Sequence, residues 1–177
     1  MNHNNAKYFR LLAVALTSRG LGYAVLEGGR SLVESSHTSV RNADKNKQCM
    51  AKVKKLVAFY RPDMLVLPDV AAGKSRRSAR IKRLHREVVN SAAKGKLQFE
   101  SISEKQLRSL LLGNPNGTKQ VIAETLAKRF PDELALRLPP KRRPWDSADS
   151  RMDVFDAVAL AMAFRMKRAS IDFQEKM

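Results

Sequence analysis

The stretch LLAVALTSRGLGYAVLE, residues 11–27, decides the fold of this chain. Two runs of apolar and β-branched residues flank a polar break, Thr17-Ser18-Arg19-Gly20, and Gly22 follows shortly after it. Apolar runs of this length with glycines between them predict two buried, adjacent antiparallel strands. One interpretation is a plain core hairpin. The other places an active site at the end of the first strand and its turn, because sites usually lie on loops carried by a rigid sheet.

In the rest of the chain, the periodicity of apolar residues predicts an α/β protein with a mixed sheet. A third strand and a helix lead to MLVL, whose unbroken apolar character is typical of a strand buried on both faces. The order of elements predicts an antiparallel meander followed by parallel strands reached through helical crossovers. We expect strands at 31–40, 64–67 and 97–102, helices at 42–61, 76–94, 103–112, 118–130 and 149–169, and a fraying tail at 171–177.

The composition is that of a globular protein. With 177 residues, of which 44% are hydrophobic and 29% charged, the chain is large enough to bury a core, and we expect one domain over residues 1–170. The single cysteine, Cys49, excludes an intramolecular disulfide, and we expect it as a small apolar residue of a helix. The opening MNHNNAKYFR has no apolar core of the signal-peptide type, so we expect a cytoplasmic, nucleoid-associated protein.

The net charge indicates a polyanionic partner. Lys and Arg number 34 against 17 Asp and Glu, which gives +17 and a pI near 10.5. Nucleic acid is the commonest polyanion for such a protein. An anionic membrane is the weaker alternative, because the basic segments lack an exposed aromatic face. Aromatic content of 6% argues against base-stacking platforms, so we expect contacts to phosphates more than to bases. Charge alone does not choose between DNA and RNA.

The cations concentrate in two segments. The helix after MLVL is the most cationic of the chain, and LPPKRRP, residues 138–144, is an extended basic segment stiffened by proline. A solvated surface helix is the alternative for the first segment, and His85 within it has no visible metal partner. We expect Trp145 to be a hydrophobic anchor, with a wedge between bases as the alternative. The candidate phosphate-binding residues are Arg19, Lys74, Arg76, Arg77, Arg80, Arg83, Lys141, Arg142 and Arg143.

Three aspartates mark the last predicted helix. Asp149, Asp153 and Asp156 follow one another at spacings of four and three residues, which predicts that all three carboxylates share one helical face. Hard oxygen ligands of this kind suit Mg²⁺ or Mn²⁺. A solvated helix face is the alternative, and near the start of a helix Asp149 and Asp153 would also favour its dipole.

Three pieces of the sequence together resemble a known family. T-S-R-G-x-G-Y after the first strand, V-L-P-D on the central strand and D-V-F-D-A-V-A-L-A on the last helix are similar to the RuvC-like Holliday junction resolvases of the ribonuclease H-like superfamily. The resemblance runs over residues 9–164, nearly the whole chain. It implies a five-stranded ribonuclease H-like sheet flanked by helices, and a homodimer acting on branched DNA.

The same resemblance implies a two-metal centre. Members hold two divalent metals with acidic side chains from the first strand, the central strand and the last helix, and the metals drive phosphodiester cleavage. Asp153 and Asp156 match the pair on the last helix. The first-strand aspartate falls at Ala15 and the central-strand acid at Pro68, one residue before Asp69. The catalytic candidates implied are Asp69, Asp153 and Asp156, and the candidate ligands for Mg²⁺ or Mn²⁺ are Asp69, Asp149, Asp153 and Asp156.

Ala15 and Pro68 stand where the resemblance expects metal ligands, and this departure leads to several functional hypotheses. A natural pseudonuclease, a nuclease with a rearranged centre, and an alanine introduced at position 15 each explain the departure. We expect a protein that binds branched or duplex DNA through phosphates, with weak or lost nuclease activity and a role in recombination or repair. The alternatives are a magnesium-dependent crossover junction endodeoxyribonuclease using Asp153 and Asp156, and a basic RNA-associated protein.

Overall fold

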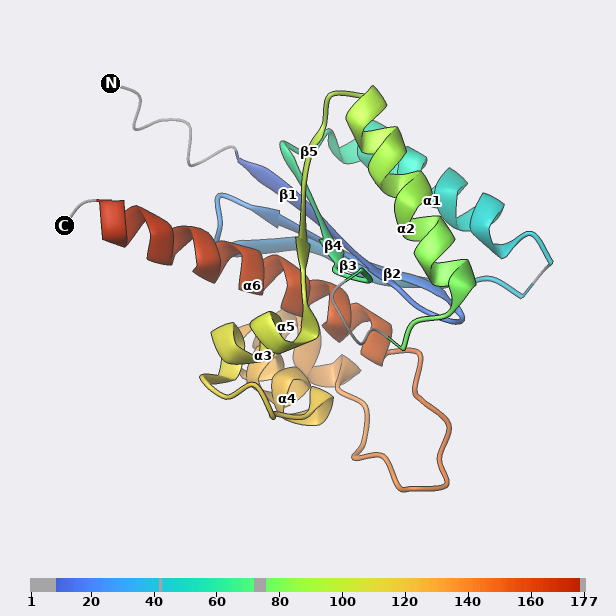
Figure 1. The fold of residues 1–177 in the computed structure, drawn as a ribbon. Coiled ribbons are helices and arrows are strands. Elements are labelled where there is room, and N and C mark those ends of the chain that lie inside the picture. Colours follow the sequence, from blue (N-terminus) through green and yellow to red (C-terminus); the bar gives the residue numbers. More distant parts are fainter. Residues whose placement is uncertain (1–8, 42, 72–75, 176–177) are drawn as a thin grey trace.

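A central sheet lies between two layers of helices (Figure 1). The computed structural model describes residues 9–41, 43–71 and 76–175. The strands are β1 Arg10–Leu16, β2 Gly20–Glu27, β3 Ser31–Ser39, β4 Met64–Pro68 and β5 Gln98–Ile102. The helices are α1 Lys45–Tyr60, α2 Ala79–Lys94, α3 Glu104–Leu112, α4 Lys119–Arg129, α5 Pro131–Leu134, a 3₁₀ turn η1 Ala135–Arg137, and α6 Met152–Glu175.

The sheet has the mixed topology that the sequence predicts. Its order is β3-β2-β1-β4-β5, with β1, β2 and β3 antiparallel and β1, β4 and β5 parallel. The helices α1 and α2 form the crossovers between the parallel strands, which is how parallel neighbours are normally connected. The carboxyl ends of β1, β4 and β5 therefore meet at one edge of the sheet, the usual place for a site in an α/β fold.

Alternation along β1 divides the core in two. Leu12, Val14 and Leu16 face α1 and α2, whereas Leu11, Ala13 and Ala15 face α6 and the short helices. Cys49 is buried in α1, as predicted, and burial raises the pKa of its thiol. On the other side α6 is apolar on nearly every position from Val154 to Phe164, because this helix is covered by the sheet and by α3 and α4.

Two glycines of the opening stretch allow close backbone packing. A Cβ on Gly22 would lie 1.9 Å from the carbonyl oxygen of Asp153, so only glycine lets β2 approach the start of α6 this closely. A Cβ on Gly20 would lie 2.0 Å from the carbonyl oxygen of Thr38 on β3. The G-x-G pattern thus fixes the distance between the hairpin, its sheet neighbour and the last helix.

Several boundaries and placements differ from the sequence predictions. The last helix begins at Met152 rather than 149 and continues to Glu175, because no glycine or proline interrupts it, so the predicted tail is helical over 171–175. The apolar residues of 118–130 predict that Val121, Ile122, Leu126 and Phe130 all face inward, but Val121 is 45% exposed, because α4 turns Ile122 and Leu126 to the core. Trp145, predicted as a hydrophobic anchor, is 76% exposed. None of the helices in the described ranges combines the length and apolar character needed to cross a bilayer.

Candidate functional site

The turn between β1 and β2 is closed by Thr17. Its backbone N–H donates to the carbonyl of Gly20 at 3.0 Å, and its hydroxyl accepts from the backbone N–H of Gly20 at 3.2 Å. The same hydroxyl donates to Asp153 Oδ2 at 3.2 Å. One threonine side chain therefore ties the turn to the first turn of α6, and it is buried because both elements cover it.

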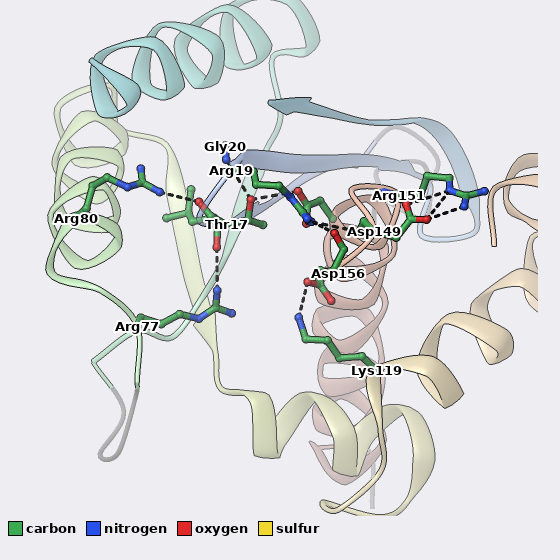
Figure 2. Close-up of polar contacts among 12 residues, drawn as sticks. Thr17, Arg19, Gly20, Arg77, Arg80, Lys119, Asp149, Arg151 and Asp156 are labelled. Carbon is green, nitrogen blue, oxygen red and sulfur yellow. Dashed lines mark hydrogen bonds and ion pairs between the residues drawn. The ribbon is translucent and has the colours of Figure 1, made fainter. Parts of the chain in front are cut away.

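Cationic side chains from α2 and from the segment just before it bind the carbonyl oxygens of this turn. Arg77 donates from Nη1 to the carbonyl of Leu16 at 3.1 Å, and Arg80 donates from Nη2 to the carbonyl of Thr17 at 2.8 Å (Figure 2). The carbonyl of Ser18 accepts from Arg80 as well, at 3.3 Å. Two of the predicted phosphate-binding arginines thus satisfy backbone acceptors that the turn would otherwise leave without partners.

Arg19 connects the turn to the loop before α6. Its guanidinium donates to the carbonyl of Ala148, to the carbonyl of Asp149 at 3.2 Å and to Asp153 Oδ1 at 3.2 Å. Its side chain stays 35% exposed, so the guanidinium lies at the boundary between the buried ion pair and solvent. Arg19 therefore holds the N-terminal end of α6 against the hairpin.

Asp153 is a buried carboxylate. The residue is 4% exposed, and Thr17 and Arg19 supply one hydrogen bond to each of its oxygens. Burial raises the pKa of Asp153, and this effect outweighs the nearby Arg19 charge, which acts in the opposite direction. The side chain predicted as a metal ligand is therefore part of the internal packing of α6 on the hairpin.

Asp156 faces a surface pocket at the carboxyl ends of the parallel strands. The floor of this pocket is apolar and includes Ala15 at the end of β1, Pro68 at the end of β4 and Ile102 at the end of β5. Lys119, the first residue of α4, donates to Asp156 Oδ2 at 2.6 Å (Figure 2). The pocket therefore brings together three of the four positions that the resemblance singles out, Ala15, Pro68 and Asp156, but only Asp156 carries a carboxylate, and a lysine neutralises it.

The rest of the charged rim of the pocket comes from Arg77, just before α2, and from Glu104 and Arg108 of α3. Glu104 lies 3.8 Å from Arg77 and 3.4 Å from Arg108, measured between oxygen and guanidinium nitrogen. The rim thus has three cations and two carboxylates, and each carboxylate has a cationic neighbour. Sequence reasoning missed Glu104, Arg108 and Lys119. Lys119 is 37 residues from Asp156, and no local pattern links two positions so far apart.

Asp149 does not share a helical face with the other aspartates. It precedes α6, where its carboxylate forms a two-pronged ion pair with Arg151, with Nη2–Oδ2 at 2.6 Å and Nε–Oδ1 at 3.1 Å (Figure 2). The Arg151 hydrogen bonds hold the pKa of Asp149 below its usual value. The predicted common face is wrong because the helix starts later than the spacing suggests.

Asp69 has a local contact in the turn after β4. Its Oδ1 accepts from the backbone N–H of Ala71 at 2.9 Å, and it does not line the pocket beside Pro68. Its backbone N–H donates to the carbonyl of Ile102 at 2.8 Å, which continues the β4–β5 ladder by one residue. The one-residue offset from Pro68 therefore takes the carboxylate away from Ala15 and Asp156, as the alternation of a strand requires.

The four predicted metal ligands therefore do not converge on one site. Across residues 9–41, 43–71 and 76–175, no group of three or more His, Cys, Asp and Glu side chains is placed to hold a metal ion. Asp153 is buried against Arg19, Asp149 pairs with Arg151, and Asp156 pairs with Lys119. A two-metal centre needs several carboxylates converging from different elements, and this donor set does not fit it.

The other predicted phosphate-binding residues lie on the surface. Arg76 is exposed before α2, Arg83 is exposed on α2, and Lys141, Arg142 and Arg143 are exposed in the loop before α6. Lys74 lies outside the described residues. His85 is half-buried, with Nε2 3.4 Å from Ser101 Oγ, and burial lowers its pKa. The sequence favours a surface or phosphate-side position for His85, and the half-buried ring agrees with this only in part.

Comparisons with known proteins place this fold. No protein-family model and no curated protein sequence matches the chain. Among solved structures, RuvC of Thermus thermophilus matches with a TM-score of 0.65 and 16% identity, over 92% of this chain and 96% of that one. The fold is RuvC-like.

Two further structures agree. T. thermophilus RuvC in complex with a Holliday junction substrate matches with a TM-score of 0.65 and 14% identity, over 92% of this chain and 96% of that one. The yeast mitochondrial Holliday junction resolvase Ydc2 matches with a TM-score of 0.59 and 12% identity, over 94% of this chain and 84% of that one. The RuvC-like fold accounts for the sheet order, and the predicted ribonuclease H-like architecture is confirmed.

Proposed function

We propose that this chain binds branched or duplex DNA through phosphate contacts and that its nuclease activity is weak or absent. The observation that carries the proposal is the pocket at the carboxyl ends of β1 and β4. The pocket is lined by the positions at which the resemblance expects the acidic centre, but Ala15 and Pro68 occupy two of them and Lys119 neutralises Asp156. The likeness to a RuvC that was solved with a Holliday junction substrate supports DNA as the partner.

The chemistry of the donor set argues against metal-dependent cleavage. Mg²⁺ and Mn²⁺ take hard oxygen ligands in a near-octahedral arrangement. Ala15 offers no ligand atom, Pro68 offers only its backbone carbonyl, and the oxygens of Asp153 already accept hydrogen bonds from Thr17 and Arg19. Asp156 would have to exchange Lys119 for a metal. We therefore derive no metal-dependent step for this chain.

The largest concentration of positive charge lies on α1 and α2. These two helices carry ten Lys and Arg residues and one acidic residue, Glu87. A groove between them is lined by Lys47 and Lys54 of α1 and by Arg83 and Lys94 of α2, with Glu87 as its one acidic side chain. None of these four cations has an ion-pair partner within the described ranges. Such a row of unpaired cations is suited to the evenly spaced charges of a nucleic acid backbone.

The phosphate-binding surface follows from these positions. Arg76 is exposed three residues before α2, and the loop cations Lys141, Arg142 and Arg143 are exposed in the segment before α6. Three further arginines are held by the protein itself: the guanidinium groups of Arg19, Arg77 and Arg80 donate to backbone carbonyls of the β1–β2 turn and of the loop before α6. We expect these three arginines to stabilise the edge of the sheet, and we expect the exposed cations to contact the phosphates.

A homodimer and a role in DNA recombination or repair complete the proposal. Both come from the resemblance to junction resolvases, which act on two-fold symmetric substrates. Light scattering of the purified protein, alone and with a four-way junction, measures the mass directly. A mass of two chains supports the dimer, and a mass of one chain both alone and on the junction contradicts it.

The proposal is tested by measuring affinity for a four-way junction, the matched duplex and a structured RNA at two salt concentrations. Phosphate-dominated binding predicts that affinity falls by about 10³ between about 50 and 200 mM salt if some six phosphates are contacted. Lys47→Glu/Lys54→Glu should weaken binding and lower the salt slope by about 2. The matched control Lys128→Glu/Arg168→Glu reverses two exposed charges elsewhere and should do less. Affinity that is independent of salt contradicts the proposal, and tighter binding to RNA than to either DNA favours an RNA-associated protein.

A further inference from the structure

Trp145 is the only tryptophan of the chain and one of its most exposed apolar side chains. It lies in the loop that connects η1 to α6, and 76% of its surface is open to solvent. In the described part of the chain, the one pair of packed aromatic rings is Phe59–Tyr60, on α1. An exposed indole ring beside cationic side chains offers a flat aromatic surface on which a nucleic acid base can stack.

The loop holds Trp145 outward on a hydrogen-bonded turn. The backbone N–H of Asp146 donates to the carbonyl of Arg143 at 3.1 Å, and the backbone N–H of Arg143 donates to Asp146 Oδ2 at 3.0 Å. Arg142 Nε donates to the carbonyl of Asp146 at 2.8 Å. These bonds use the acidic group of the turn internally, so the tip presents the indole ring and the cations of residues 141–143.

The turn lies beside the candidate site. Arg19, in the β1–β2 turn, donates to the carbonyls of Ala148 and Asp149, three and four residues after Trp145. Figure 1 shows the same loop extending from the N-terminal end of α6, away from the sheet. A nucleic acid lying on the cationic edge of the sheet would therefore meet this tip.

We propose that Trp145 stacks on an unpaired base of bound DNA while Lys141 and Arg143 contact the flanking phosphates. The inference rests on the proposed function. Every base has a π-face, so an exposed indole can stack on it without sequence preference, and neighbouring cations hold the backbone. A tryptophan with basic neighbours also suits a membrane surface, but binding there usually takes an amphipathic helix with a broad apolar face, and this loop has one aromatic side chain.

The test uses the fluorescence of Trp145, which needs no label because the chain has no other tryptophan. The full-length protein is titrated with a duplex that has one unpaired base, with the same duplex fully paired, and with vesicles containing anionic lipid. If Trp145 stacks on the base, the duplex with the unpaired base should quench the tryptophan fluorescence more than the fully paired duplex does. Trp145→Ala should reduce the preference for the unpaired base by about tenfold, from the usual stacking energy per base, and Trp145→Phe should keep most of it.

The control is Phe59→Ala, which removes an aromatic side chain of similar exposure, 78%, from α1. It should leave the preference for the unpaired base unchanged. If the protein binds DNA with strong salt dependence but Trp145→Ala keeps the full preference, the stacking inference is wrong and the proposed function stands. If neither DNA binds at low salt, both are wrong. Emission that changes with vesicles and not with DNA assigns Trp145 to a membrane surface and overturns the inference.

Discussion

Adding one methyl group at Gly22 should separate the last helix from the sheet. The Cβ of Gly22→Ala would lie 1.9 Å from the carbonyl oxygen of Asp153 and 2.5 Å from its carbonyl carbon. A carbon and an oxygen in contact usually lie about 3.3 Å apart, so β2 and α6 would have to part by on the order of 1 Å. Because the obstacle is backbone rather than a flexible side chain, no rotamer change relieves it.

The cost can be estimated from the packing that this movement disturbs. Overpacking a core usually costs about 1–3 kcal/mol, and a gap of about 0.5–1 Å removes a quarter to a half of each dispersion contact. Phe155, Val158 and their neighbours on α6 are fully buried, so many contacts are affected. We expect a loss of about 3 kcal/mol or more, a large part of a typical stability of about 5–15 kcal/mol.

Urea unfolding monitored by circular dichroism measures this loss. The control is Gly95→Ala, at the end of α2, where φ is −82° and the nearest atom to the added Cβ lies 3.4 Å away. That variant should change the unfolding free energy by less than about 1 kcal/mol. If the free energies of unfolding of Gly22→Ala and Gly95→Ala differ by less than about 0.5 kcal/mol, the close approach of α6 to β2 does not depend on glycine and the reasoning is refuted.

Three further predictions concern the carboxylates of the site. Burial raises the folded-state pKa of Asp153 above its usual 3.8, so the folded protein keeps a proton on this carboxyl at a pH where the unfolded chain has released it. The free energy of unfolding of the wild type should therefore fall, relative to that of Asp153→Asn, as the pH rises from 3.8 to the raised pKa. Urea midpoints of both proteins across acidic pH check this, and an advantage that grows with pH contradicts it. Because the donor set does not fit a metal, millimolar Mg²⁺ or EDTA should leave the melting temperature unchanged, whereas a bound metal would raise it. Lys119→Met removes the ion pair with Asp156, which is partly exposed, so the free energy of unfolding measured in urea should fall by less than about 1 kcal/mol, and a loss above about 3 kcal/mol means that the pair is a buried structural contact.

Much of the fold follows from local pattern. The apolar runs at residues 11–27 and 64–67 become β1, β2 and β4. Ser103 and Thr118, whose side chains are typical of helix N-caps and which begin the predicted helices 103–112 and 118–130, accept hydrogen bonds from the backbone N–H of Gln106 and Val121. These features depend on neighbours in sequence, which is why the residues alone specify them.

The site depends on contacts that sequence pattern does not carry. Asp153 looks like a surface or metal-binding carboxylate in the sequence, but Gly22 lets β2 come close enough to bury it. Arg77 and Arg80 look like phosphate ligands, yet the turn of residues 16–19 leaves carbonyls that need donors, and these arginines supply them. The positions of Ala15 and Pro68 could be predicted from the resemblance, whereas Lys119 became visible only when α4 was placed beside α6.

Cleavage of a four-way junction tests the central claim most directly. The protein is incubated with the junction and Mg²⁺ or Mn²⁺, alongside Ala15→Asp, Ala15→Asp/Pro68→Glu and Asp156→Asn. We predict that the wild-type chain binds the junction without nicking it, and that Ala15→Asp alone stays inactive because Pro68 still offers no carboxylate. Metal-dependent nicking by the wild type that disappears in Asp156→Asn would contradict the account and identify an active nuclease.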